Sequence, residues 1–307
     1  MKYVLLSVFL FTLILLMSFK TAYYSSPRRK ENPRHIPGSE QYQLLAPGIL
    51  ALVDQVEACP FEWVYISSKD SLKLAGRYYH IHDGAPLAII FHGYRSTSMR
   101  DCAPLFILCR ELGYNVLLPD MRAHGHSQGR IISLGMLERY DCLRWVEYAL
   151  NRWGEGLEIL LAGFSMGAAT VMMAAPAMPR QVKGMICDCG YSSPRAIIRD
   201  VSGKLHVLAC LSYFFIRLSG RLLGRFDPEK GSSLSALRES RVPALFIHGE
   251  DDRYVPCSMA YENYAACAAE PKMLLTVPGA GHCLSFLTDE NAYRKAVRDF
   301  LRKIGLS

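Results

Sequence analysis

A serine between two glycines is the residue in this sequence best suited to nucleophilic chemistry. Ser165 lies in the stretch GFSMG, after an apolar run at 158–162 and before a helical pattern at 166–177. A serine on a tight strand-to-helix turn has its hydroxyl exposed above the sheet, and small residues such as Gly163 and Gly167 allow that turn to pack. The context therefore predicts a nucleophile, with an ordinary turn serine as the alternative.

A serine hydroxyl needs a base, and the base needs a carboxylate that fixes its tautomer. Among nine histidines, His282 follows the last apolar run and precedes the final helical pattern, so we expect it on a loop that reaches Ser165. Three consecutive acids at 250–252 follow another apolar run, and Asp188 ends the run before it. The residues alone leave the choice among these acids open.

The oxyanion of a tetrahedral intermediate requires backbone N–H donors that are already in position. Met166 directly follows the serine at the start of a predicted helix and should supply one donor. Tyr94, in the loop FHGYR after the apolar run 87–91, should supply the second. Its side chain is expected to line the acyl pocket or to lie on the surface.

The elements that must position these residues alternate between short apolar runs and helical patterns. This alternation predicts an α/β fold with a mostly parallel eight-stranded sheet, helices on both faces and ligands at the carboxyl ends of the strands. The expected strands are 61–67 and 72–80, which form an antiparallel hairpin, then 87–91, 115–119, 158–162, 182–188, 244–248 and 273–277. The expected helices are 99–112, 134–152, 166–177, 257–268 and 288–304, with two further helices at about 195–240 as a cap over the carboxyl edge.

The N-terminal segment, 1–22, contains an uncharged apolar run at 3–19 that is just long enough to cross a bilayer. No small-residue cleavage site follows, which favours a single-pass anchor over a signal peptide and secretion. The proline-containing stretch 23–58 is interpreted as a tether, and 59–307 as the catalytic domain. Basic residues after the anchor, among them Arg28, Arg29 and Lys30, favour a cytoplasmic domain near anionic lipid, but the orientation stays open.

Composition excludes some partners and cofactors. The net charge of +7 comes from 35 basic and 28 acidic residues, without the basic stripe and motif of a nucleic-acid-binding protein. The ten cysteines have no zinc-site spacing and are interpreted mostly as buried free thiols, which is typical of a reducing compartment. We expect no metal and no organic cofactor.

Five stretches, FHGY, PDMRAHGHSQG, GFSMG, IHGEDDRYVP and GAGHC, resemble the α/β-hydrolase superfamily over residues 60–304. The resemblance is greatest to bacterial membrane-associated hydrolases related to serine aminopeptidases and monoacylglycerol lipases. It implies that Asp252 is the acid of the triad. It also implies a loop that shapes the surroundings of the pocket, matched here by Asp120, Arg122, His124, Gly125 and Ser127.

The sequence therefore predicts a serine hydrolase that cleaves a small-molecule carboxylic ester through an acyl-enzyme. A serine peptidase or amidase is the alternative among enzymes. An inactive binding protein with the same fold is the alternative from another class, although such proteins usually lack a member of the triad, and Ser165, Asp252 and His282 are all present here.

Overall fold

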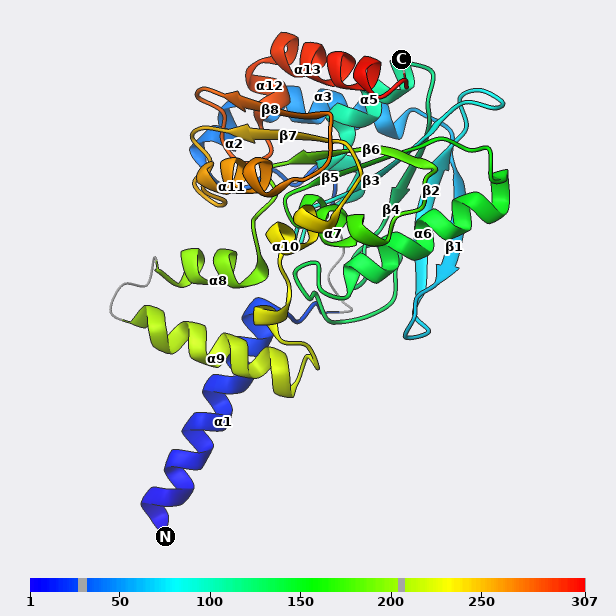
Figure 1. Cartoon of the computed structure of the whole chain (residues 1–307). Coiled ribbons are helices and arrows are strands. Elements are labelled where there is room, and N and C mark those ends of the chain that lie inside the picture. Colours follow the sequence, from blue (N-terminus) through cyan, green and yellow to red (C-terminus); the bar gives the residue numbers. More distant parts are fainter. Residues whose placement is uncertain (27–31, 204–207, 307) are drawn as a thin grey trace.

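An eight-stranded sheet forms the centre of the molecule (Figure 1). The computed structural model describes residues 1–26, 32–203 and 208–306. The strand order is β1-β2-β4-β3-β5-β6-β7-β8, with β2 antiparallel to both of its neighbours and every other pair parallel. The strands are β1 (Glu62–Ser67), β2 (Lys73–Tyr79), β3 (Leu87–Phe91), β4 (Asn115–Pro119), β5 (Ile159–Phe164), β6 (Val182–Asp188), β7 (Ala244–Gly249) and β8 (Lys272–Val277). The predicted fold class, including the N-terminal hairpin, is confirmed.

Helices cover both faces of this sheet. On one face lie α3 (Ala46–Glu57), α5 (Ala103–Glu111) and α13 (Glu290–Lys303), and on the other α6 (Glu138–Trp153), α7 (Met166–Ala174), α10 (Ser233–Glu239) and α11 (Ser258–Ala266). Neighbouring strand residues point to opposite faces, so Ile89 belongs to one hydrophobic cluster and Ile90 to the other. Burial on both faces explains why strands such as β3 and β5 are continuous apolar runs.

The stretch interpreted as a tether contains two helices instead. These are α2 (Glu40–Leu44) and α3, and α3 buries Leu52, Val53 and Val56. The apolar residues of α3 recur every three or four positions, which is the pattern of a helix with one buried face. Pro47 does not interrupt α3, because proline is tolerated in the first turn, where its missing N–H has no intrahelical partner. Arg28, Arg29 and Lys30 lie outside the described residues.

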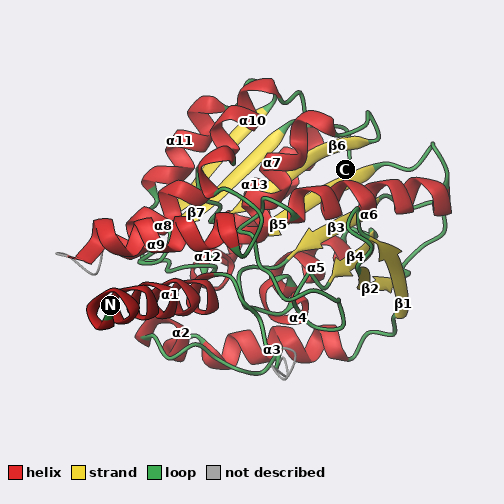
Figure 2. Cartoon of the chain, turned by 90° about the horizontal axis from the view of Figure 1, so that it is seen from below, coloured by secondary structure: helices red, strands yellow, loops and turns green. Residues whose placement is uncertain are grey.

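A second group of helices extends away from the sheet. Helix α1 (Lys2–Ala22) projects from the body, and α8 (Pro194–Gly203) and α9 (Ala209–Leu222) lie between the body and α1 (Figures 1 and 2). The rings of Phe11 in α1 and Phe215 in α9 are 5.3 Å apart. The expected cap range also included α10, but α10 packs on α7 with Leu237 fully buried in the core. The two-helix insert is therefore α8 and α9. The described residues also contain two short helices, α4 (Ser98–Asp101) and α12 (Ser285–Thr288), and two 3₁₀ turns, Ala175–Ala177 and Pro228–Lys230.

Helix α1 is the one helix, among those described, that is long and apolar enough to cross a membrane. Only 6% of its most apolar 18-residue window is buried in the protein. Most of its large apolar side chains are thus exposed, unlike those of a core helix.

Candidate active site

Ser165 occupies a sharp turn between β5 and α7. Its backbone has φ 52° and ψ −114°, outside the regions that ordinary residues favour, and its N–H donates to the Asp188 carbonyl at 2.8 Å. A Cβ on Gly163 would lie 2.3 Å from the carbonyl carbon of Gly167, and one on Gly167 would lie 2.2 Å from the Phe91 oxygen. These contacts with backbone leave no room for a side chain, so glycine is required on both sides of the serine.

The structure brings Ser165, His282 and Asp252 together at the carboxyl edge of the sheet. His282 Nε2 lies 2.9 Å from Ser165 Oγ, and His282 Nδ1 lies 2.6 Å from Asp252 Oδ2. The serine follows β5, the aspartate follows β7 and the histidine follows β8. The hydrogen bond to Asp252 favours the tautomer with the proton on Nδ1, which leaves Nε2 as an acceptor facing the hydroxyl.

Asp252 is held as an ionised group. Its side chain is completely buried, and Oδ1 accepts the N–H groups of Tyr254 and Val255 at 2.8 and 2.9 Å. Burial opposes the negative charge, but His282 and these hydrogen bonds hold the pKa of Asp252 well below its usual value. His248 adds a further contact, with its Nε2 3.3 Å from Asp252 Oδ2.

The other candidate acids have different surroundings. Glu250 and Asp251 are exposed, and Glu250 accepts a hydrogen bond from the Thr276 hydroxyl at 2.8 Å. Asp188 is buried at the end of β6, where neither carboxylate oxygen has a hydrogen-bond partner of normal geometry among the described residues. Burial raises the pKa of Asp188 to about 7. Among the four acids, Asp252 is the one placed against the imidazole.

The loop after β3 passes directly beside the serine. A Cβ on Gly93 would lie 3.3 Å from the Ser165 Cβ, and the Gly93 N–H donates to Asp101 Oδ2 at 2.9 Å. Tyr94 follows in this loop, and Met166 is the first residue of α7. The two residues predicted to donate to an oxyanion therefore belong to the two segments that adjoin Ser165.

The side chains of this loop bind the end of α1, which the sequence analysis did not anticipate. The Tyr94 hydroxyl donates to the Ala22 carbonyl at 2.9 Å. Arg95 Nη2 donates to the carbonyls of Thr21 at 2.8 Å, Tyr24 at 3.1 Å and, more weakly, Lys20 at 3.2 Å. The last carbonyls of a helix lack intrahelical partners and favour a cation, so the end of α1 requires hydrogen-bond donors from elsewhere in the chain. Nothing in the local sequence identifies which residues supply them.

The loop at 120–127 forms a buried polar support under the same region. Arg122 donates to both oxygens of Asp141 at 2.6 and 2.7 Å. His124 Nε2 accepts the Arg95 N–H at 3.0 Å, and so ties this loop to the loop after β3. Burial opposes the charge of Asp120, but its hydrogen bonds and cationic neighbours lower its pKa to about 2. Gly125 has φ 48°, and the Ser127 hydroxyl accepts the Ala75 N–H at 2.8 Å.

Comparison with known proteins agrees with this architecture. The family described as serine aminopeptidase, S33, matches residues 85–233. Protein YqkD of Bacillus subtilis is 31% identical over 234 residues, which cover 73% of this chain and 74% of that protein. The chain belongs to the α/β-hydrolase superfamily. Another relative, the α/β-hydrolase domain-containing protein WAV2 of Arabidopsis thaliana, is 23% identical over 87% of this chain and 85% of its own length.

Solved structures show the same hydrolase fold. The Pyrococcus furiosus esterase Pf2001 superimposes with a TM-score of 0.63 at 23% identity, covering 81% of this chain and 94% of the esterase. Est1E of Butyrivibrio proteoclasticus, solved with ferulic acid, gives a TM-score of 0.60 at 22% identity, over 79% of this chain and 99% of Est1E. At these identities the likeness extends to the fold.

Proposed function

We propose that this α/β-hydrolase is a serine hydrolase that cleaves a carboxylic ester through an acyl-enzyme. The observation that carries the proposal is the chain of two hydrogen bonds, 2.9 and 2.6 Å long, that links Ser165 through His282 to Asp252. A hydroxyl beside an imidazole, which in turn contacts a buried carboxylate, is the arrangement that activates serine as a nucleophile.

The reaction proceeds in two steps. Ser165 Oγ attacks the acyl carbonyl while His282 Nε2 takes its proton, and the backbone N–H groups of Met166 and Tyr94 stabilise the oxyanion. His282 then gives the proton to the departing alcohol. Water, deprotonated by the same imidazole, attacks the acyl-enzyme, and His282 then gives that proton to Ser165 Oγ as the acid is released. Asp252 stays ionised and stabilises the imidazolium in both steps.

We favour an ester over a peptide as the substrate. The insert between the body and α1 presents apolar side chains such as Leu211 and Phe214, both about half exposed. Contact of the substrate with these side chains would favour an apolar acyl group. An aminopeptidase would additionally need a carboxylate to hold the substrate amine, so aminoacyl amides form the comparison class in the test.

Helix α1 is proposed to remain attached as a membrane anchor. Cleavage after a signal peptide would remove the carbonyls at 20–22 that Tyr94 and Arg95 bind. Tyr23, directly after α1, is completely buried and packs edge-to-face on Phe226 at 4.9 Å. These contacts make the end of α1 part of the folded hydrolase, which a removable leader would not be.

A fluorophosphonate probe tests the function directly, because it labels an activated serine whatever the natural substrate is. We expect the full chain in detergent to be labelled and Ser165→Ala not to be. Ser235→Ala, which removes an exposed hydroxyl, is the matched control and should be labelled like the wild type. Absence of labelling in the wild type, or equal labelling of Ser165→Ala, contradicts the proposal. Esters of graded acyl length and aminoacyl amides then define the substrate class.

A further inference from the structure

Two cysteines lie beside the proposed base. Cys283 directly follows His282, and Cys189 follows β6, whose last residue accepts the N–H of Ser165. Both are free thiols, and their Sγ atoms are 3.2 Å apart. Neither cysteine has a part in the proposed hydrolysis. Two thiols from segments 94 positions apart therefore meet at the catalytic imidazole.

The spacing of these groups fits a metal ion. The two Sγ atoms and a ring nitrogen of His282 all lie within 4.8 Å of one another, the one such group found in the described part of the chain. Zinc binds sulfur at about 2.3 Å and nitrogen at about 2.0 Å, so its tetrahedral ligands are separated by about 3.8 Å between sulfurs and about 3.6 Å between sulfur and nitrogen. Shifts of about half an ångström would bring the sulfurs to that separation.

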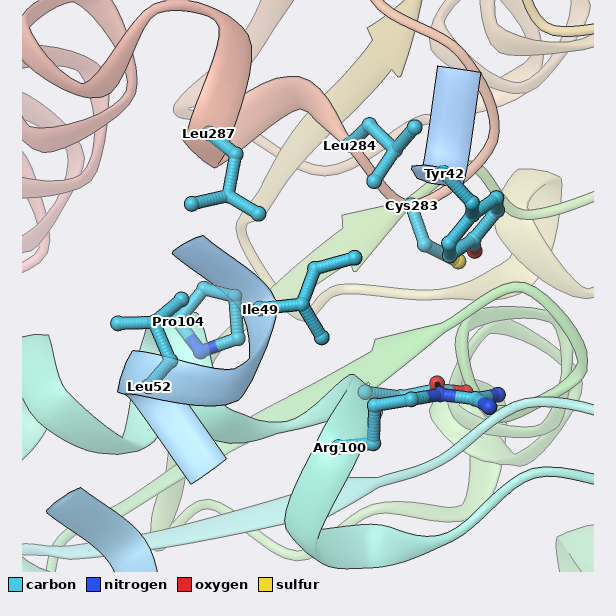
Figure 3. Close-up of a pocket in the computed structure, with 9 residues that line it drawn as sticks. Tyr42, Ile49, Leu52, Arg100, Pro104, Cys283, Leu284 and Leu287 are labelled. Atoms are coloured by element: carbon cyan, nitrogen blue, oxygen red, sulfur yellow. Dashed lines mark hydrogen bonds and ion pairs between the residues drawn. The ribbon is translucent and has the colours of Figure 1, made fainter. Parts of the chain in front are cut away.

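The donor set indicates which metal would bind. Two thiolates and an imidazole are ligands that Zn²⁺ and other thiophilic cations prefer, whereas Mg²⁺ and Ca²⁺ take oxygen. Two thiolates also neutralise a divalent cation, which matters because Cys189 is only 1% exposed. Cys283 lines a small cavity with Tyr42, Arg100 and Leu284 (Figure 3). This cavity of about 20 Å³ has room for about one water molecule on the Cys283 side of the three groups, although Cys189 and His282 do not line it.

We propose that Cys189, His282 and Cys283 form a binding site for Zn²⁺ or a similar thiophilic cation, and that metal at this site inhibits the hydrolase. The two thiols lose their protons to solvent as the two metal–sulfur bonds form. His282 has both nitrogens engaged, one with Asp252 and one with Ser165. A metal on either nitrogen therefore removes the tautomer control or the acceptor that catalysis needs. The inhibition rests on the proposed function, whereas the metal binding does not.

Cadmium titration tests the binding independently of catalysis. The probe is Cd²⁺ alone, added to the reduced full chain carrying Ser165→Ala, which retains all three ligands. We expect one equivalent to bind with the ultraviolet charge-transfer absorbance of Cd–thiolate bonds. Adding Cys189→Ala or Cys283→Ala should weaken binding roughly 100-fold or more, since even outer contacts of metal sites change affinity by about 10–100-fold. Cys210→Ala removes an exposed cysteine in α9 and should bind like the parent.

No thiolate absorbance, or absorbance that survives in both the Cys189 and Cys283 variants, overturns the site. If either alanine variant fails to fold, its serine counterpart replaces it, with thermal unfolding as the check.

Zinc inhibition tests the consequence for activity. We expect Zn²⁺ to suppress fluorophosphonate labelling and ester hydrolysis by the wild type, and a chelator to restore both. Cys189→Ala should remain active at the zinc concentration that inhibits the wild type. Metal binding without inhibition overturns the regulatory part of the proposal. Metal binding in a chain that the probe never labels would leave the site standing and refute the proposed hydrolase function instead.

Discussion

The two sides of the proposed active site are supported in different ways. On the nucleophile side, which we call the core side, Ser165 is fixed by β5, α7 and two glycines whose neighbours are backbone atoms of the core. On the oxyanion side, the loop carrying Tyr94 and Arg95 makes side-chain hydrogen bonds to the end of α1, outside the sheet and its helices. The nucleophile is therefore positioned by core packing, whereas the oxyanion loop also depends on the segment expected to enter the membrane.

This difference has an energetic meaning. A Cβ at Gly167 would have to displace the backbone of β3, so the nucleophile side tolerates almost no change. A hydrogen bond to a charged group such as Arg95 contributes only about 1.5–3 kcal/mol. The contacts with α1 can thus be altered without unfolding the body. Catalysis should be affected differently by substitutions on the two sides, which the following variants test.

The largest effect is expected from the acid on the core side. Asp252→Asn keeps the shape of the side chain but favours the wrong tautomer of His282, and such a change lowers kcat by about 10⁴-fold in a serine protease. We expect a loss of that order in kcat for ester hydrolysis. Asp251→Asn is the matched control, because Asp251 is exposed and adjacent, and it should retain nearly full activity. The reverse ranking would mean that Asp252 is not the acid of the triad.

The core side was also the part that the sequence allowed us to predict. The central strands, such as β3, β5 and β7, are short, continuous apolar runs, so their positions follow from hydrophobicity alone. The stretch GFSMG between a strand and a helix marked Ser165 because glycine is required where backbone approaches backbone. His282 was marked by its place after the last strand. The residues alone left Glu250, Asp251 and Asp252 open, because three adjacent carboxylates have the same chemistry until the fold buries one of them.

The oxyanion side was much less predictable. The hydrogen bond from Tyr94 to Ala22 joins residues 72 positions apart, and no periodicity encodes it. Helix α3 was not predicted, although its buried residues recur at helical spacing and its Pro47 lies in the first turn, where proline is tolerated. The meeting of Cys189 and Cys283 likewise depends on strand order. Contacts between distant segments become visible only once the topology is known.

An intermediate effect is expected from the contacts between the oxyanion loop and α1. Arg95→Ala removes the donor to the carbonyls of Thr21 and Tyr24, and combining it with Tyr94→Phe removes the hydroxyl as well. The Tyr94 N–H remains but is less firmly positioned. Because misplacement by about 1 Å costs about 100-fold, we expect kcat to fall by up to about that factor in the double variant. KM should change little, since the oxyanion forms only after binding.

Arg180→Ala is the control for this pair. Arg180 is exposed just before β6, at the sheet edge opposite the site, and its loss should leave kcat unchanged. A double variant with wild-type kcat would mean that α1 has no influence on catalysis, and the contrast between the two sides would then be wrong. The free energy of unfolding is measured alongside with urea. A large loss of that free energy together with the fall in kcat would indicate that the whole fold is loosened.

The smallest effect is expected in the pH dependence of stability, from Asp188 beneath the nucleophile. Burial raises its pKa to about 7, so the folded state binds a proton that the unfolded chain, with an ordinary pKa near 4, has already released. Its contribution is therefore full below about pH 4 and is lost as the pH rises through 7. Between about pH 5.5 and 8 the loss amounts to about 2 kcal/mol of unfolding free energy. Asp188→Asn cannot release this proton, so its stability relative to the wild type should increase by that amount over the same range.

Urea unfolding of both proteins at the two pH values measures this, with the exposed Asp251→Asn as the control. A constant difference between wild type and Asp188→Asn would show that this carboxyl does not titrate there, and that the core side accommodates its charge.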